Sequence, residues 1–292
     1  MKALIPAAGF GTRFLPASKT VPKEMLPVGA KPAIQLIVEE AFAAGAEEVV
    51  VVVSRDKPAL RRHFEPDGEW LARCAGKPER EEALLHLEEL GRRMRWVFQE
   101  EQKGLGHAVL QAADLLRGEK DPVLVLLGDA LVSGESPSAA MAEVSRAFAG
   151  ASVVGLEEVP LEKVSRYGIA DGSRVELPEG LAAAGVAYRL SGLVEKPAPE
   201  LAPSRLAVAG RYLLDPAVFD ILSTEKPGVG GEIQLTDSIR RLMEERPVYG
   251  YRYPGRRHDI GNPRGYFETL AAFNQVISGG ASGGGVPGSW QL

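Results

Sequence analysis

The sequence is short of cysteine, of histidine and of long hydrophobic segments, and each shortage excludes a class of protein. A single cysteine, Cys74, among 292 residues excludes an internal disulfide and a cysteine-based metal cluster. The four histidines are scattered, without the H-x-x-x-H spacing of a metal site. No apolar run approaches the roughly 20 residues of a membrane-spanning helix, and the first residues lack the pattern of a signal peptide. We therefore expect a cytoplasmic protein with no membrane partner.

Positive charge is also not in excess, since the formal net charge is −5. This balance argues against a nucleic-acid partner. The first 31 residues nevertheless hold five cations and one anion, a local charge of +4, from Lys2, Arg13, Lys19, Lys23, Lys31 and Glu24. A cationic opening on an acidic protein is consistent with a local anion site. On charge alone, a few solvated surface lysines explain it equally well.

Short apolar runs alternate with helix-periodic segments through the first half of the chain. Strands are expected at 2–7, 48–54, 95–99, 122–130 and 151–159. Helices are expected at 33–46, 57–64, 106–117 and 136–149, with a polar, helix-prone insertion at 65–93. Such alternation is typical of a parallel, doubly wound sheet.

The second half changes character, because its strand-like runs follow one another with little helix between them. These runs occupy 167–171, 186–195 and 206–213, and helices are expected at 215–222, 232–244 and 263–277. We therefore predict an α/β fold with a Rossmann-like mixed, mainly parallel central sheet, helices on both faces and a small antiparallel extension.

The predicted organisation is one domain over 1–277. Its nucleotide-binding half is about 1–135, and its sugar-phosphate-binding half is about 136–277. The Gly/Ser-rich tail at 278–292 is expected to be disordered.

A glycine loop follows the first strand in "PAAGFGTRFLPASKTVPKEMLPV". The dinucleotide fingerprint G-x-G-x-x-G fails because Phe14 stands in place of the third glycine, and no G-K-[ST] completes a P-loop. Taken alone, the G-x-G is better interpreted as a plain tight turn. Glycines also let backbone N–H groups approach a phosphate, and Arg13 can add a bidentate contact. Together with Lys19 and Lys23 on one proline-stiffened loop, a polyphosphate site becomes the better interpretation.

Further candidates stand where predicted strands end, the edge at which open parallel sheets bind ligands. Asp129 follows "VLVLLG" and Asp259 lies in "RRHDIG"; both suit a hard Mg²⁺ ion, although a turn aspartate or pairing with Arg256 or Arg257 explains them too. In "LVEKP", Pro197 predicts that the strand ends near Glu195 and Lys196, so that both could reach a sugar phosphate. An exposed edge pair blunted by proline is the alternative.

Two features of the predicted nucleotide half suit a flat base. Gln99 has a carboxamide that can read a pyrimidine edge, and Gly104 lies in the glycine-rich helix start "KGLGHAV". A helix N-cap with two glycines explains the second equally well.

Eight segments, in order from residue 3 to about 266, closely resemble the bacterial UTP–glucose-1-phosphate uridylyltransferases of the sugar-nucleotidyltransferase superfamily. They are "PAAGFGTRFLPASKTVPKEMLPV", "KPAIQLIVEEA", "KGLGHAVL", "SRYGIA", "LVEKP", "APSRLAVAGRYLL", "GGEIQLTDSI" and "HDIGNPRGY". Two residues depart from the family pattern: Ala130 replaces a second acid found in many relatives, and His258 replaces the usual tyrosine before Asp259.

The resemblance implies the roles of the candidate residues. Uridine would be held by Ala8, Gly9, Gly11, Glu24, Gln99 and Gly104. Arg13 and Lys23 would hold the triphosphate as catalytic cations, and Asp129 and Asp259 would coordinate Mg²⁺. Gly168 and Glu195 would contact the glucose, while Lys196 would serve as a third catalytic cation on the phosphate of glucose 1-phosphate.

The implied reaction is UTP plus glucose 1-phosphate giving UDP-glucose and pyrophosphate, by a homodimer or homotetramer. A thymidylyltransferase of the same superfamily is the nearest alternative, although the "PKEMLP" segment favours the uridylyl branch. A catalytically silent nucleotide-sugar regulator is an alternative of another class. Retention of Arg13, Lys23, Asp129, Lys196 and Asp259 argues against it.

Overall fold

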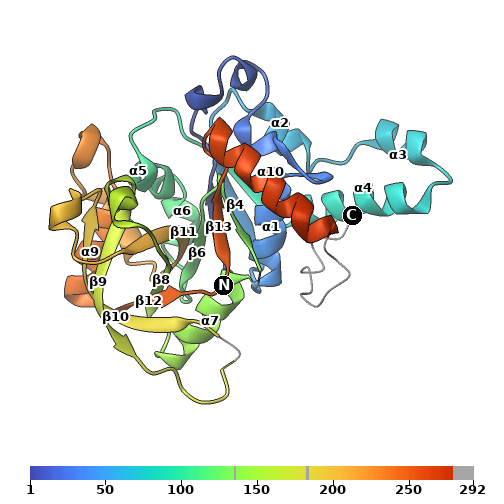
Figure 1. The fold of residues 1–292 in the computed structure, drawn as a ribbon. Helices are drawn as coiled ribbons and strands as arrows, with labels where there is room; N and C mark the ends of the chain where they lie inside the picture. The colour runs from blue at the N-terminus through green and yellow to red at the C-terminus, as the bar shows by residue number, and fades with distance from the viewer. Residues whose placement is uncertain (135, 182–183, 279–292) are drawn as a thin grey trace.

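A computed structural model describes residues 1–134, 136–181 and 184–278. Its centre is a 9-stranded sheet in the order β5-β4-β1-β6-β11-β8-β12-β10-β9 (Figure 1). The strands are β1 (Ala3–Pro6), β4 (Val49–Val53), β5 (Met94–Phe98), β6 (Val123–Leu126), β8 (Ser152–Glu158), β9 (Gly168–Val175), β10 (Val186–Glu195), β11 (Leu206–Leu214) and β12 (Val248–Arg252). Two small two-stranded sheets pair β2 (Pro27–Val28) with β3 (Lys31–Pro32), and β7 (Ala130–Ser133) with β13 (Arg256–Asp259).

The mixed, mainly parallel sheet predicted from the sequence is confirmed. Strands β5, β4, β1 and β6 are parallel neighbours, and only β10 and β11 run against the other strands of the sheet. The run of valines in β4 lies at the buried centre of the parallel part, with all five side chains buried. Their β-branched side chains suit a strand that is covered on both faces.

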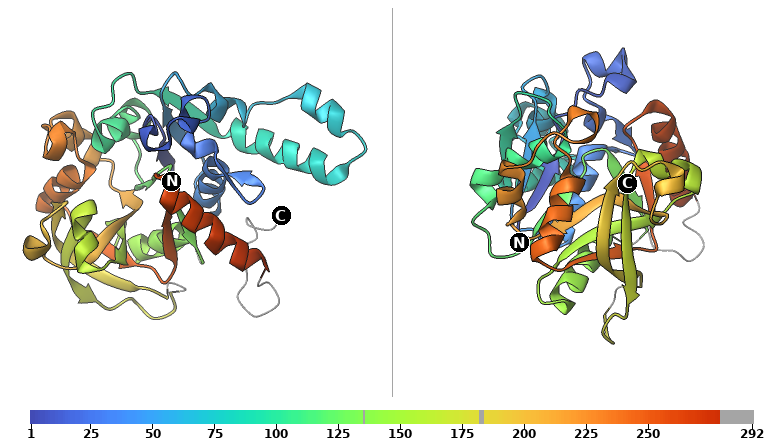
Figure 2. Two further views of the ribbon diagram at one scale, coloured as in Figure 1. Left: turned by 45° about the horizontal axis from the view of Figure 1, so that its top comes forward. Right: turned by 90° about the vertical axis from the view of Figure 1, so that its left-hand side faces the viewer.

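Helices cover both faces of the sheet, as predicted (Figure 2). They are α1 (Ala33–Ala43), α2 (Pro58–Arg62), α3 (Gly68–Cys74), α4 (Pro78–Arg92), α5 (Leu105–Leu110), α6 (Ala113–Leu116), α7 (Pro137–Ala147), α8 (Val218–Ser223), α9 (Leu235–Glu245) and α10 (Pro263–Ser278). Alternate valines of β4 belong to different cores: Val51 is in the core that contains residues of α1, α7 and α10, and Val50 is in the core that contains residues of α5, α6, α8 and α9. They are divided in this way because successive side chains of a strand point to opposite faces of the sheet.

The predicted helix-prone insertion at 65–93 forms α3 and α4, which project from the body as an arm (Figures 1 and 2). Asp67 caps α3 by accepting hydrogen bonds from two backbone N–H groups of its first turn. No helix of the described ranges is both long enough and apolar enough to cross a membrane. The tail predicted to be disordered, 278–292, lies outside the described residues except for Ser278.

Some element predictions were wrong in ways that matter for the site. The single helix expected at 106–117 is divided into α5 and α6, since Ala112 bonds back only three residues, to Val109. The strand expected at 122–130 ends at Leu126, because the chain turns at Gly128 and Asp129 after a last hydrogen bond from Leu127 to Gly210 of β11. The strands β12 and β13 were missed. Both are short, polar or glycine-containing, and are defined by partners far away in the sequence.

Candidate active site

The candidate residues gather beyond the carboxyl ends of the parallel strands β1, β5 and β6. Ala8 and Gly9 follow β1, Gln99 follows β5, and Asp129 lies in the turn after β6. The loop after β1 is the dark blue segment at the top of Figure 1. The sequence predicted this position for the candidate residues, at the ends of strands where open parallel sheets bind ligands.

The glycine loop takes a conformation that requires glycine. This requirement lies at Gly11, whose φ of +66° is in the left-handed region; Gly9 has no such constraint, because an added side-chain carbon there would meet nothing within 4 Å. Phe14, which breaks the dinucleotide fingerprint, is buried and packs edge-to-face against Tyr266 of α10 with the ring centroids 6.2 Å apart. The loop is thus anchored by Phe14, while Arg13 and Lys19 are exposed.

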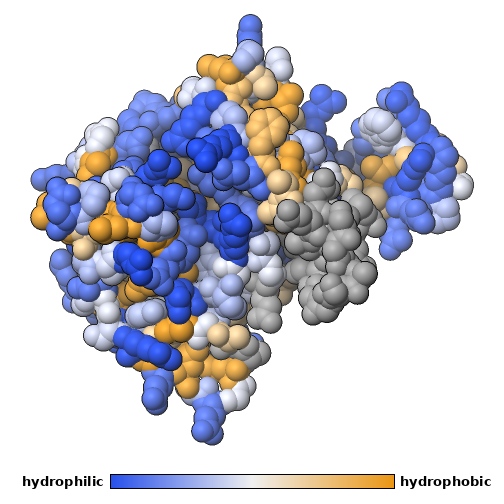
Figure 3. Space-filling model, viewed as in Figure 1, coloured by the Kyte–Doolittle hydropathy of each residue, from blue (hydrophilic) through white to orange (hydrophobic). Residues whose placement is uncertain are grey.

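Exposed apolar side chains also gather around this loop and on the start of α10. Phe10, Leu15, Val21 and Phe267 are each exposed, and Figure 3 shows a hydrophobic strip over these elements at the top of the molecule. The loop therefore presents an apolar outer surface together with its cations.

Lys23 is the cation that the structure places against a candidate metal ligand. Its Nζ lies 2.5 Å from Oδ2 of Asp129, and its side chain is 13% exposed. Burial opposes the charge of Lys23, but Asp129 and Glu24 together hold its pKa above the ordinary value. Burial likewise works against ionised Asp129, and the charge of Lys23 outweighs it, so the pKa of Asp129 is lowered. Both groups are therefore charged at neutral pH.

Asp129 and Asp259 come together although 130 positions separate them in the chain. Strand β13 pairs with β7 so that Asp259 lies opposite Ala130, and the N–H of Ile260 donates to the carbonyl of Asp129 at 2.9 Å. A side-chain carbon at Gly261 would lie 2.9 Å from an oxygen of each carboxylate. Because both oxygens lie 2.9 Å from the same point, the distance between them is at most twice that value.

This pair of carboxylates fits a hard divalent ion. Within the described ranges no three His, Cys, Asp or Glu side chains form a group that could hold a metal by themselves. Mg²⁺ commonly takes one or two carboxylates and completes its coordination with water and substrate phosphates. Asp129 and Asp259 supply such a partial set beside the cationic loop.

A buried arginine supports the turn that carries Asp129. Arg211 of β11 is fully buried and donates to both oxygens of Glu40 on α1, at 3.0 and 2.6 Å. It also donates to the carbonyl of Ala130 at 2.9 Å. Burial opposes its charge, but Glu40 raises the pKa of Arg211 above the ordinary value. The pair ties α1 and β11 to the residue next to Asp129.

Replacing Arg211 by alanine is expected to lower the free energy of unfolding by about 3 kcal/mol, because Glu40, whose side chain is only 13% exposed, would lose its charged partner and keep only the hydroxyl of Ser138. Urea unfolding followed by circular dichroism measures the change. Arg205→Ala is the matched control, since Arg205 and Glu158 form an exposed pair worth up to about 1 kcal/mol. Equal losses in the two variants would contradict the role given to the buried pair.

The predicted sugar-side residues are also brought together. Strand β10 ends at Glu195, as Pro197 suggested, and pairs Glu195 with Gly168 of β9. A side-chain carbon at Gly168 would lie 3.2 Å from Oε2 of Glu195, so a larger residue would crowd the carboxylate. Lys196 follows with φ of +47°, a left-handed conformation that turns the chain, and its Nζ lies 3.3 Å from Oε1 of Glu195.

Thr236 was missed as a member of this group. Its hydroxyl donates to Oε2 of Glu195 at 2.8 Å, which fixes one side of the carboxylate. The residue lies in the segment "GGEIQLTDSI", but an isolated threonine at the start of a helix has no sequence signal of its own.

Gln99 and Gly104, which were predicted to bind the base, are both in close contact with other parts of the protein. The carboxamide Nε2 of Gln99, which is 2% exposed, lies 2.8 Å from Nδ1 of His107. Gly104 has φ of +101°, and a side-chain carbon there would lie 2.8 Å from the carbonyl oxygen of Ile233. The close approach of the chain at Ile233 is by itself a reason for glycine at this position.

Glu24 does not stand free in the site. Its carboxylate is 1% exposed, and both oxygens lie 2.9 Å from Nζ of Lys57. Lys57 precedes α2 and was missed by the sequence analysis, because a lysine at a helix start resembles any surface cation. The role of Glu24 as a ligand of uridine stays a prediction, but its observed partner is Lys57.

His258, which departs from the family pattern, is buried and has a hydrogen-bond partner and an aromatic neighbour. Its Nε2 lies 2.8 Å from Oγ of Ser133, and its ring packs edge-to-face on Phe273 at 5.1 Å. Burial and two nearby arginines lower the pKa of His258 to about 4, so the ring is neutral at pH 7. The replacement leaves the Asp259 strand well packed.

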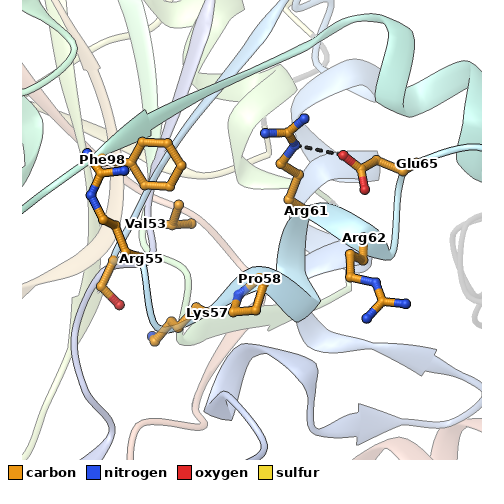
Figure 4. A pocket seen from close by; sticks show the side chains of 9 residues that line it. Val53, Arg55, Lys57, Pro58, Arg61, Arg62, Glu65 and Phe98 are labelled. Atoms are coloured by element: carbon orange, nitrogen blue, oxygen red, sulfur yellow. Dashed lines mark hydrogen bonds and ion pairs between the residues drawn. The ribbon is translucent and has the colours of Figure 1, made fainter.

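A pocket of about 310 Å³ adjoins the site on the far side of Lys57 (Figure 4). It lies between the carboxyl ends of β4 and β5 and helix α2, and is lined by Val53, Ser54, Arg55, Lys57, Pro58, Arg61, Arg62, Glu65 and Phe98. Two of its arginines are engaged with nearby acids: Arg61 with Glu65, and Arg55 with Glu100.

Comparison with known proteins identifies close relatives. The sequence pattern of the family described as "Nucleotidyl transferase" matches residues 2–276. A UTP–glucose-1-phosphate uridylyltransferase of Staphylococcus haemolyticus is 44% identical over 274 residues, which cover 93% of this chain and 91% of that protein. A protein of the same name from Staphylococcus epidermidis is 43% identical over 274 residues, which again cover 93% of this chain and 91% of that protein.

Solved structures agree with the sequence relatives. A UDP-glucose pyrophosphorylase complexed with UDP-glucose superposes with a TM-score of 0.81 and 39% identity, covering 94% of this chain and 98% of that one. A UTP-bound enzyme of the same kind from Acinetobacter baumannii gives a TM-score of 0.80 and 34% identity, covering 94% and 93%. Both matches extend over nearly the whole chain.

Proposed function

Because this chain belongs to the nucleotidyl transferase family, we propose that its site transfers the uridylyl group of UTP to α-D-glucose 1-phosphate, giving UDP-glucose and pyrophosphate. The observation that carries the proposal is the meeting of Lys23 with Asp129 and Asp259 beyond the ends of the parallel strands. That cluster offers one cation for phosphates and two carboxylates for a metal ion beside a glycine loop.

The chemistry requires no general base. A phosphate monoester has its second pKa near about 6, so glucose 1-phosphate is largely a dianion at neutral pH and is already a nucleophile. One of its oxygens attacks the α-phosphorus of UTP in line with the departing pyrophosphate. This is consistent with a site whose charged residues are cations and carboxylates.

The main obstacle is the repulsion between two polyanions. Two unit charges 4 Å apart repel by about 4 kcal/mol at an effective dielectric of 20. Arg13 and Lys23 would offset the charge of the triphosphate, and Lys196 that of the sugar phosphate. Lys23 lies 2.5 Å from Asp129, and Lys196 lies 3.3 Å from Glu195.

Nucleotidyltransferases generally use a divalent metal ion, and we propose Mg²⁺ held by Asp129 and Asp259. When bound, the ion would act as a Lewis acid that stabilises negative charge on the phosphates. The remaining work falls to this chain: binding both substrates in line, with Glu195 and Gly168 on the glucose and the loop from Ala8 to Gly11, with Gln99 and Gly104, on the uridine.

The identity of the base is the point at which the nearest alternative is tested. Pyrophosphate release with glucose 1-phosphate is expected to be about 10–200-fold more efficient for UTP than for dTTP, since one methyl-sized group is worth about 1–3 kcal/mol. Equal or greater efficiency with dTTP would identify a thymidylyltransferase. UDP-glucose binding without any pyrophosphate release would instead favour a silent regulator.

We also propose a homodimer or homotetramer located in the cytoplasm. Both are expectations from the resemblance to the uridylyltransferases. Size-exclusion chromatography with light scattering measures the mass of the particle, and a monomer of 31.3 kDa would exclude the oligomer.

A further inference from the structure

Lys57 and Glu24 form a buried ion pair that the proposed chemistry does not use. Their side chains are 6% and 1% exposed. The three N–H donors of the lysine ammonium are matched by three acceptors: both oxygens of Glu24 at 2.9 Å and the carbonyl of Ala7 at 2.8 Å. The ammonium of Lys57 therefore has a partner for each of its donors, and the pair is almost wholly buried.

Stability alone does not explain such a pair. Burial lowers the pKa of Lys57 and raises that of Glu24, so each group resists ionisation and is held by the other. A well-packed apolar pair of similar volume is often as stable or more stable, whereas a buried pair fixes geometry when it joins separate segments. The role of this pair therefore follows from the segments whose relative positions it fixes.

The pair joins three segments at the nucleotide side of the site. The first segment is the start of the glycine loop, where Ala7 directly precedes Ala8 and Gly9. The second contains Glu24, which directly follows Lys23. The side-chain carbons of Lys23 lie 3.5–3.6 Å from the position of a side-chain carbon at Gly11, so the lysine stem runs along the loop. Lys57 itself begins α2, beside the pocket in Figure 4, where its side chain points away from Arg61 and Arg62.

We propose that Lys57 is a positioning residue of the uridylyl transfer, which holds the glycine loop through the Ala7 carbonyl and holds Lys23 through Glu24. The proposal rests on the proposed function and assigns to Glu24 the role of an internal anchor. Lys23 is the other cation whose charge favours ionised Glu24. Without Lys57, Glu24 stays buried and draws Lys23 away from Asp129. UTP then meets a displaced loop and a misdirected cation, whereas the glucose-phosphate side at Glu195 and Lys196 is unchanged.

The test compares Lys57→Met with the double variant Glu24→Met/Lys57→Met and with Arg62→Met, which removes an exposed cation of α2. Calorimetry measures UTP binding without sugar phosphate, and initial rates give kcat and the KM for glucose 1-phosphate. Lys57→Met is expected to weaken UTP binding at least about 10-fold and to lower kcat about 100-fold, a loss typical of misplaced catalytic groups. The KM for glucose 1-phosphate is expected to change less than about 3-fold, and Arg62→Met to leave all three values unchanged.

The double variant is expected to bind UTP more tightly than Lys57→Met and more weakly than the unaltered chain, because no unpaired acid remains to attract Lys23. It also carries the test by itself if Lys57→Met does not fold. UTP binding by the double variant equal to that of the unaltered chain would overturn the proposal. A parallel weakening of UTP and glucose 1-phosphate would overturn it too, since a general structural loss moves both.

These outcomes are distinguishable from failure of the proposed function. If the unaltered chain releases no pyrophosphate from UTP and glucose 1-phosphate, the uridylyl transfer is wrong. The calorimetric comparison of UTP binding then still decides whether Lys57 positions a nucleotide loop.

Discussion

Asp129→Asn is expected to lower kcat for UDP-glucose formation by about 10³-fold and to shift the Mg²⁺ titration to higher concentration. The asparagine keeps the shape of the side chain but removes the negative charge, so Asp259 is left as the one carboxylate of the pair. In the unaltered chain Nζ of Lys23 lies 2.5 Å from Oδ2 of Asp129, so the variant also removes this ion pair. Such a site accelerates the reaction mainly by electrostatic stabilisation of the transferring phosphate, and losing a single group commonly slows the rate by about 10²–10³-fold.

Initial rates measured over a Mg²⁺ series check this expectation. Asp171→Asn is the matched control, because Asp171 is exposed on β9 and bonds to Ser191 away from the carboxylate pair. The control is expected to have the kinetics of the unaltered chain. An unchanged Mg²⁺ titration in Asp129→Asn would place the metal elsewhere.

Lys196→Ala is expected to lower kcat by about 10²–10³-fold and to raise the KM for glucose 1-phosphate, with UTP binding nearly unchanged. The side chain of Lys196 is 43% exposed and, among the described residues, its ammonium is held only by Glu195, at 3.3 Å, so we expect it to be able to turn to a bound phosphate. The left-handed backbone at this residue turns the chain directly after the end of β10. Removing the charge therefore affects the sugar phosphate and its attack more than it affects the nucleotide.

Two further variants separate charge from backbone in this prediction. Lys196→Met keeps the length of the side chain and is expected to behave like Lys196→Ala, because the charge is what both lack. Lys163→Ala removes an exposed lysine of the segment Leu161–Arg166 and is expected to have no effect. Near-normal kinetics in Lys196→Met would remove this lysine from the site.

The parts of the fold that could be predicted from sequence are those with local signals. The five valines of β4 are predicted to be buried because β-branched runs suit a strand covered on both faces, and all five are buried. Gln99 and Asp129 could be placed beyond the carboxyl ends of strands because each follows a short apolar run in the sequence. Pro197 likewise marks the end of β10 after Glu195 because it cannot continue the ladder.

Other features depend on pairings that no local pattern encodes. Asp259 reaches Asp129 through the pairing of β13 with β7, two short strands far apart in the chain. Gly104 was interpreted as room for a base, whereas the nearest obstruction is the chain at Glu232 and Ile233. Lys57 carries no sequence signal, because what distinguishes it from a surface lysine is burial against Glu24.

The central claim is that an oxygen of the sugar phosphate attacks the α-phosphorus of UTP. The direct measurement uses glucose 1-phosphate with its non-bridging phosphate oxygens labelled with ¹⁸O, unlabelled UTP and Mg²⁺, and mass spectrometry of both products. UDP-glucose is expected to retain all of the label, and pyrophosphate is expected to carry none. Label in the pyrophosphate, or no labelled UDP-glucose, would contradict it.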